Sequence, residues 1–257
     1  MTTVHEIADW LDTLLGTNST PDYPGAVNGL QLENIAEIFG VAAAVDFSSR
    51  AIEGAIAGNA NLIIVHHGMF WGGTTAVRGV SYRRLKRLID QDIAIYSSHL
   101  PLDRHPTLGN NVLLARELGL EPTGTFAKYR EIFIGVRGES DVETRKIADR
   151  ARDFAAEQGG GVRTTMIANS QRTRRWALCT GAGASAETLG EAEQLGIDTL
   201  IVGEGPHWSA VHAEDHDLAV IYAGHYATET LGVRALAKEV AAKFQISQTF
   251  VSAPTGL

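Results

Sequence analysis

The sequence has almost no cysteine, since Cys179 is the only one among 257 residues. A single thiol cannot form an intrachain disulfide, which favours a protein of a reducing compartment. Long apolar runs are also missing, and none approaches the ~20 residues that a membrane helix needs. The N-terminal MTTVHEIADW lacks the basic and then apolar order of a signal peptide. We therefore expect a soluble, cytoplasmic protein with no membrane partner.

An excess of positive charge is absent as well. The chain has 22 Lys and Arg residues against 30 Asp and Glu residues, so its formal net charge is −8. Proteins that coat nucleic acid or an anionic membrane need a basic surface, and the charge argues against both partners. A small anionic ligand held by metal ions remains compatible with this charge.

Short apolar runs alternate with segments of helical periodicity along the chain. Strands are predicted at 39–45, 62–65, 93–97, 131–136, 162–167, 175–179, 199–202 and 218–223, and helices at 4–15, 49–58, 80–91, 110–118, 141–157, 186–195, 208–215 and 226–244. Thr3 and Glu6 form a capping-box pattern before the first helix, and Ser48 can cap the second. Residues 16–34 have the composition of a loop. The alternation predicts an α/β fold with largely parallel sheets.

The two halves of the chain share a nine-residue pattern. Residues 95–103, IYSSHLPLD, align without gaps on residues 221–229, IYAGHYATE. A strand, turn, helix and strand precede each copy; they end on His66-His67 in the first half and on Gly203-Glu204 in the second. We infer a duplication and predict two similar α/β lobes, 1–125 and 126–257, with the closing helix packing across them.

Side chains that bind metals follow these predicted strands. His66 and His67 end one strand, His225 follows another, and Asp103 and Glu229 close the two copies of the pattern. Ligands gather at the carboxyl ends of parallel strands, so we expect these residues to meet in a cleft between the lobes. If a helix opens just after His225, then His225 and Glu229 lie near one helix face.

The predicted ligands for two metal ions are His66, His67, Asp103, His225 and Glu229. Imidazole nitrogen and carboxylate oxygen suit Zn, Fe, Mn, Co or Ni, and the set leaves open positions for water. The Glu229 carboxylate can bridge both ions. Two ions roughly 3.5–4 Å apart can share a hydroxide, lower its pKa and polarise the bond under attack.

Other histidines are open to several interpretations. His99 matches His225 in the repeat, and it can be a ligand, a hydrogen-bond donor behind the ligands or a catalytic proton shuttle; we assign it the last role. His207 and Glu204 can line the cleft. His212 and His216 lie four apart among acidic residues, which favours a solvated helix end over a second metal site.

At these motifs the sequence resembles the NIF-three-like family, described as hexameric proteins with a dinuclear metal centre and often named homologues of GTP cyclohydrolase 1 type 2. The shared motifs are Asn28–Gln31, Val65–Trp71, His99–Asp103, Gly109–Asn111, Cys179–Gly183, Gly203-Glu204 and Ala223–Glu229. The resemblance implies the five ligands given above, two α/β lobes with the metals between them, and a toroidal homohexamer. Gly68 departs from the family pattern, because some members have proline there.

The resemblance and the ligand types together favour a metal-dependent hydrolase. A metal-bound hydroxide would attack a purine C8, an amide-like carbon or a phosphoester of a nucleotide-like substrate, while His99 relays a proton. The alternative is a non-enzymatic, metal-holding or regulatory scaffold built on a ring. A third option, nucleic-acid binding through the opening of the ring, is opposed by the net charge.

Overall fold

The structure is a computed structural model that describes residues 2–256, and it contains two compact units. Unit 1 holds the chain up to Leu102 together with Gly232–Ala253, and unit 2 holds Asp103–Leu231 together with the stretch from Pro254. These units follow the packing of the chain, whereas the predicted lobes, 1–125 and 126–257, follow the repeat. That division of the chain stays a prediction.

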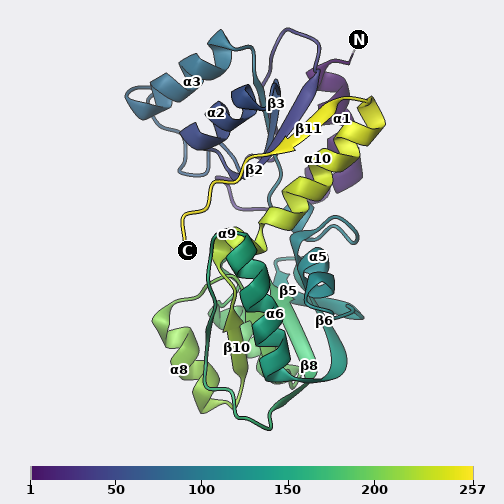
Figure 1. Cartoon of the computed structure of the whole chain (residues 1–257), viewed down its shortest axis with the longest axis vertical. Helices are drawn as coiled ribbons and strands as arrows, with labels where there is room; N and C mark the ends of the chain where they lie inside the picture. Colours follow the sequence, from purple (N-terminus) through teal and green to yellow (C-terminus); the bar gives the residue numbers. More distant parts are fainter. Residues whose placement is uncertain (1, 257) are drawn as a thin grey trace. The chain divides into compact units, whose positions relative to one another are not determined.

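Unit 1 is built on a five-stranded sheet (Figure 1). Its strands are β1 (Gly29–Leu32), β2 (Gly40–Asp46), β3 (Leu62–His67), β4 (Ala94–Ser97) and β11 (Ser247–Phe250). In the order β1-β4-β3-β2-β11, all neighbours are parallel except the edge strand β1, which is antiparallel to β4. The carboxyl ends of β2, β3 and β4 therefore lie along one edge of this sheet.

Helices cover both faces of the unit 1 sheet, with α2 and α3 on one side and α1 and α10 on the other (Figure 1). The helices are α1 (Val4–Leu15), α2 (Ser49–Ala57), α3 (Val80–Asp90) and α10 (Thr230–Phe244), with a short η1 (Thr17–Ser19) and the one-turn α4 (Leu100–Asp103). Both predicted caps are confirmed, because Thr3 and Glu6 form a capping box and the Ser48 side chain accepts from the Ala51 amide. Ile52 and Leu88 pack on Ile63 in a buried cluster.

Unit 2 contains a six-stranded sheet in the order β5-β6-β8-β9-β10-β7. The strands are β5 (Gly124–Tyr129), β6 (Ile132–Glu143), β7 (Arg163–Thr164), β8 (Arg172–Cys179), β9 (Thr199–Val202) and β10 (Ala219–Tyr222), and the helices are α5 (Asn110–Glu117), α6 (Thr144–Glu157), α7 (Ala186–Gln194), α8 (His207–Asp215) and α9 (His225–Thr228). Strands β8, β9 and β10 are parallel, and the other three join antiparallel.

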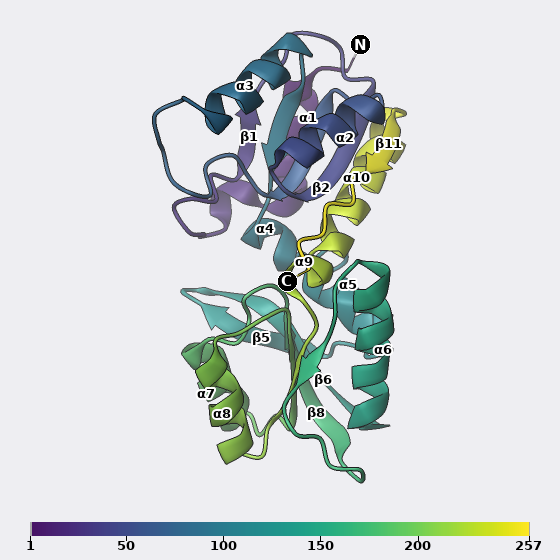
Figure 2. The same ribbon diagram turned by 60° about the vertical axis from the view of Figure 1, so that its left-hand side comes forward.

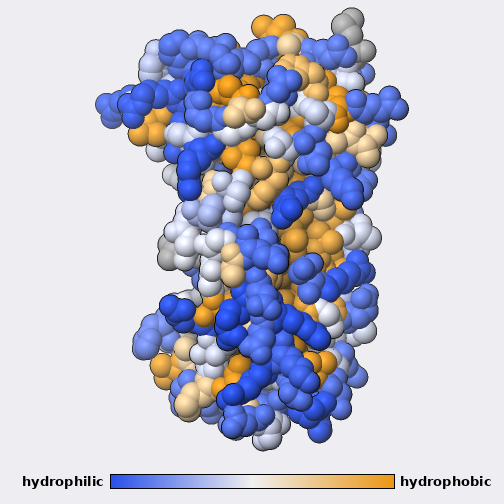
Figure 3. Space-filling model, viewed as in Figure 1, coloured by the Kyte–Doolittle hydropathy of each residue, from blue (hydrophilic) through white to orange (hydrophobic). Residues whose placement is uncertain are grey.

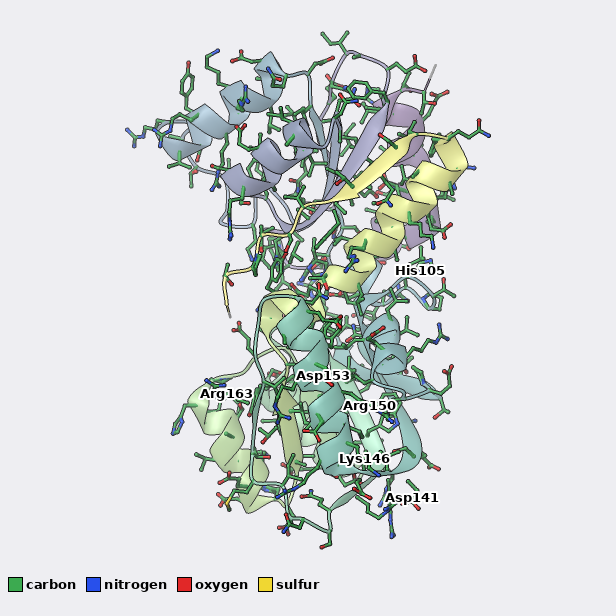
Figure 4. All side chains as sticks on the ribbon, in the orientation of Figure 1. His105, Asp141, Lys146, Arg150, Asp153 and Arg163 are labelled. Carbon is green, nitrogen blue, oxygen red and sulfur yellow. The ribbon has the colours of Figure 1, made fainter. Side chains whose placement is uncertain are left out.

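The unit 2 sheet lies between two helical layers, α5 and α6 on one side and α7 and α8 on the other (Figure 2). Side chains alternate along β8, so Trp176 and Leu178 pack in the cluster that contains α5 and α6 residues, and Ala177 packs towards α7 and α8. The outer surface of α6 is hydrophilic (Figure 3). Lys146 and Arg150 are exposed on that surface (Figure 4).

The α/β prediction with largely parallel sheets is confirmed. Both units contain a set of three adjacent parallel strands, β2-β3-β4 within the four parallel strands of unit 1 and β8-β9-β10 in unit 2, and each set carries an antiparallel strand beside its last member. The sheets differ on the other side, where β11 is parallel to β2 but β6 is antiparallel to β8. Among the described residues, no helix is long and apolar enough to cross a membrane.

Several elements differ from those predicted. Strand β6 runs to Glu143, so α6 begins at Thr144 inside the predicted helix 141–157, and the short η1 and α4 lie outside the predicted helices. Strands β1, β5 and β11 were not predicted, and Gly29–Leu32 forms β1 inside the segment that was expected to be a loop. The segment pairs with β4, so a tertiary partner overrides its loop-like composition. The predicted helix 226–244 is divided into α9 and α10 at Glu229, whose backbone has φ −106° and ψ 4°.

Candidate metal centre

Three histidines lie together at the carboxyl ends of β3 and β4 in unit 1. His66, His67 and His99 each offer a nitrogen atom, and these atoms lie within 4.8 Å of one another. Nδ1 of His66 is 3.3 Å from Nε2 of His67. Two nitrogens bound to one tetrahedral ion at ~2.0–2.1 Å are themselves roughly 3.3 Å apart. The spacing of this adjacent pair therefore suits ligands of a common ion.

Two of these imidazoles are oriented by carboxylates. Nδ1 of His67 is 2.9 Å from Oδ1 of Asp46, which ends β2, and Nδ1 of His99 is 2.8 Å from Oδ1 of Asp22. An ionised carboxylate only accepts, so each Nδ1 carries the hydrogen. The basic nitrogen of each neutral ring is then Nε2, and a carboxylate behind a histidine is the usual arrangement for a metal ligand. The sequence patterns gave no sign of these two carboxylates.

The side chain of Asp22 is buried and accepts several hydrogen bonds. Besides His99, it accepts from the Tyr23 and Leu100 amides and from the Asn28 side chain. Burial raises the pKa of the Asp22 carboxyl, but the hydrogen bond and charge of His99 and the other donors outweigh burial and hold this pKa below its usual value. Asp22 therefore stays ionised and fixes the His99 ring.

Aromatic rings stand beside the same histidines. The Trp71 ring centroid lies 4.5 Å from that of His99 and 4.7 Å from that of His67, and Tyr23 lies 5.9 Å from His99. Both aromatic side chains are partly exposed, Trp71 by 41% and Tyr23 by 48%. Flat, exposed rings of this kind can stack on a heterocycle.

Unit 2 holds a pair of potential ligands of its own, His225 and Glu229. Nε2 of His225 lies 3.2 Å from Oε1 of Glu229, and its Nδ1 lies 2.8 Å from Oε1 of Glu204. Burial lowers the pKa of His225, but the hydrogen bonds and charges of Glu229 and Glu204 outweigh burial and raise it to about 9. His225 thus has the same carboxylate-backed arrangement as His67, with Glu204 in the place of Asp46.

A glycine allows Glu229 to take this position. Gly181 has φ +62°, and a Cβ atom placed on it would lie 2.3 Å from Oε1 of Glu229. The Gly181 amide donates to the Thr228 hydroxyl, and its carbonyl accepts from the Glu204 amide. The turn therefore ties the loop after β8 to the backbone of Glu204 and to Thr228, the residue before Glu229.

Asp103 is placed by asparagines of α5. The Asn110 side chain donates to Oδ1 of Asp103 over 2.8 Å, and the Asn111 side chain donates to its backbone carbonyl. Asp103 is the last residue of α4, and it is buried. His207 lies at the exposed start of α8, whereas Glu204 contacts His225.

Comparison with known sequences identifies related proteins over almost the full length. The family model described as Duf34/NIF3 (NGG1p interacting factor 3) matches residues 2–255. A protein of Pyrococcus abyssi named GTP cyclohydrolase 1 type 2 homolog is 42% identical over 252 residues, with 98% of each chain covered. A protein of the same name from Deinococcus radiodurans is 36% identical, and the match covers 98% of this chain and 94% of that protein.

Solved structures have the same fold. The protein ybgI, titled as of unknown function, superposes with a TM-score of 0.88 at 31% identity over 100% of both chains. TTHA1606 from Thermus thermophilus gives a TM-score of 0.84 at 31% identity, again over 100% of both chains. Reduced HcgD from Methanocaldococcus jannaschii gives 0.83 at 22% identity, with 98% of each chain covered, which shows a common fold.

Proposed function

Because the chain belongs to the Duf34/NIF3 family, we propose that it is a dinuclear metal-dependent hydrolase acting on a nucleotide-like or phosphoester substrate. The observation that carries the proposal is the group of His66, His67 and His99, whose nitrogens converge within 4.8 Å. Three buried imidazoles so close together repel one another if all are protonated, and a divalent ion on the nitrogens of His66 and His67 would leave Nε2 of His99 beside it to carry a proton. The names of the curated relatives agree with a nucleotide substrate.

The proposed ligands of the two ions are His66, His67, Asp103, His225 and Glu229. The donor types fit, since three imidazoles and two carboxylates suit borderline divalent metals such as Zn, Fe, Mn, Co or Ni. Carboxylates stand behind His67 and His225, and an asparagine supports Asp103, as the partners of metal ligands commonly do. Five side chains are fewer than two ions accept, which leaves positions for water and substrate.

A pair of divalent ions would supply activation of water and polarisation of the bond under attack. The chain itself would supply proton transfer and binding. His99 is fixed by Asp22 through Nδ1, so its Nε2 is the atom that takes up or delivers a proton, as a general acid–base residue requires. Trp71 and Tyr23 would stack on the base of a nucleotide.

Metal content and turnover test this proposal together. Elemental analysis of purified protein loaded with each metal should give at least two ions per chain, and about two fewer in Glu229→Ala. The loaded protein is then incubated with GTP and with a panel of phosphodiesters. Turnover should exceed that of a His67→Ala, Glu229→Ala double variant, with His5→Ala as a control on the exposed face of α1.

The same experiment separates the hydrolase from the alternative function. Two bound ions without any turnover above the double variant would support a metal-holding or regulatory scaffold. A folded chain that takes up no ion under any loading condition would contradict both. We further propose that the chain forms a homohexamer and is located in the cytoplasm. Light scattering at micromolar concentration measures the oligomeric state, and a stable monomer would contradict the ring. Cell fractionation tests the location.

A further inference from the structure

A separate group of potential ligands lies on the helical layer formed by α7 and α8, which run side by side in unit 2 (Figure 2). Glu193 on α7, His212 on α8 and His216 at the end of α8 each offer one ligand atom, and these three atoms lie within 4.8 Å of one another. The spacing of His212 and His216 in the sequence favours a solvated helix end. Glu193 belongs to a different helix, so this spacing contains no sign of its contribution.

The hydrogen bonding of His216 determines which of its nitrogens faces the group. Its Nδ1 lies 2.7 Å from the carbonyl oxygen of His212, and a carbonyl can only accept, so Nδ1 carries the hydrogen. In the neutral ring the lone pair is then on Nε2, which lies 3.7 Å from Oε1 of Glu193. That separation is too long for a hydrogen bond. A lone pair facing a carboxylate oxygen is unfavourable, and either a proton on Nε2 or a metal cation between the two atoms relieves it.

His212 brings a second imidazole to the same carboxylate oxygen. Its Nε2 contacts Oε1 of Glu193, and its ring stacks on that of His216 with centroids 4.2 Å apart and an angle of 23° between the planes. Two protonated rings would repel each other at this distance. A metal ion uses both nitrogens and the carboxylate oxygen without placing a proton on either ring.

The surroundings favour a cation. Both histidines lie at the carboxyl end of α8, where the helix dipole is negative. Glu214, Asp215 and Asp217 add negative charge to the same end. The three side chains are 34% to 44% exposed, so an ion can reach them from solvent and keep water in its other positions.

We propose that Glu193, His212 and His216 form a metal site for a borderline divalent ion such as Zn²⁺ or Co²⁺, distinct from the two ions proposed above. His212 on the last turn of α8 and His216 at its C-cap are four apart, a spacing familiar from zinc sites, and a carboxylate completes a set of three with open positions. His5 and Glu33 provide the contrast, since this exposed pair, 3.2 Å apart, has only one imidazole.

Equilibrium dialysis of the full chain against Zn²⁺, followed by elemental analysis, tests this site. Relative to wild type, His212→Ala, His216→Asn and Glu193→Gln should each bind up to half an ion fewer per chain at the midpoint of the wild-type titration of this site. The affinity for that ion should fall at least about tenfold, since even the loss of a residue behind a ligand costs ~10–100-fold. The asparagine in His216→Asn can still donate to the His212 carbonyl but has no Nε2.

Controls make the result decisive. His5→Ala should bind as many ions as wild type, and circular dichroism in chelator should show that all variants are folded. Glu229→Ala should lose the ions proposed above but keep this one, so the two proposals fail separately. Equal zinc binding by wild type and all three variants would overturn the site and leave an ordinary surface ion pair.

Discussion

Nδ1 of His99 lies 2.8 Å from Oδ1 of Asp22, and both side chains are less than a tenth exposed. The carboxylate also accepts from two backbone amides and from the Asn28 amide group, so it fixes the loop before β1 as well as the imidazole. Asp22 therefore holds both the loop and the imidazole, and the two effects can be separated by experiment.

Asp22→Asn should destabilise the metal-free protein by about 1–3 kcal/mol. The NH₂ group of asparagine is a donor, and it would face the buried N–H groups that donate to Asp22 in the wild type. Urea unfolding in the presence of chelator measures this change. Asp9→Asn, at an exposed position of α1, is the control and should change the free energy of unfolding little. An equally stable Asp22→Asn would show that the hydrogen bonds to this carboxylate contribute little.

The lowered pKa of Asp22 also predicts how stability depends on pH. The folded-state pKa is below the unfolded value of about 3.9, so the stabilisation is complete above that pH and is lost as pH falls through the folded pKa. Between pH 5 and pH 2, wild type should therefore lose more stability than Asp22→Asn, and the difference between them should shrink. Parallel curves for the two proteins would contradict the assignment.

Gly181→Ala should disturb the Glu229 carboxylate directly. The new methyl group would lie 2.3 Å from Oε1 of Glu229, and the backbone conformation with φ +62° is unfavourable for alanine. We expect a loss of about 1–3 kcal/mol in unfolding free energy and reduced metal uptake. Gly190→Ala is the matched control: nothing lies within 4 Å of its new Cβ inside α7, so it should stabilise by about 0.5–1 kcal/mol. Equal effects of the two changes would refute this contact.

The sequence predicted most elements of the fold because local signals and tertiary packing agree in them. The capping box of Thr3 and Glu6 and the periodic apolar residues of α1 specify the same helix. The elements that the sequence does not predict include the edge strands of the sheets and the helix break at Glu229. Strands β1 and β11 become strands by pairing with β4 and β2, and no local pattern contains that information.

The candidate ligands stay a prediction from short sequence motifs. Histidines at strand ends and the repeated pattern singled out His66, His67 and His225, because these residues belong to short motifs. Their carboxylate partners were not predictable, since Asp46 meets His67 across 21 residues and Asp22 meets His99 across 77. Such contacts depend on the path of loops, which composition does not specify.

Replacing the carboxylates behind the proposed ligands should weaken metal binding without abolishing it. Glu204→Gln retains an acceptor for Nδ1 of His225 but loses the charge. We expect both Glu204→Gln and Glu204→Ala to lower metal affinity within about 10–100-fold, with the smaller loss in Glu204→Gln. Asp46→Asn should behave similarly through His67. Competition with a chromogenic chelator measures these affinities. The exposed Glu187→Gln on α7 is the control, and a loss of the same size there would indicate a general charge effect.

Trp71 should report ion binding at His66 and His67, because its ring centroid lies 4.7 Å from that of His67. A paramagnetic ion such as Ni²⁺ quenches a nearby indole, whereas Zn²⁺ has a filled d shell and no such effect. Addition of Ni²⁺ should therefore reduce the fluorescence of wild type and of Trp208→Phe, and the part due to Trp71 should vanish in Trp71→Phe. If Trp71→Phe lost as much fluorescence as wild type, the first ions would bind away from these histidines, and the proposed ligand set would fail with them.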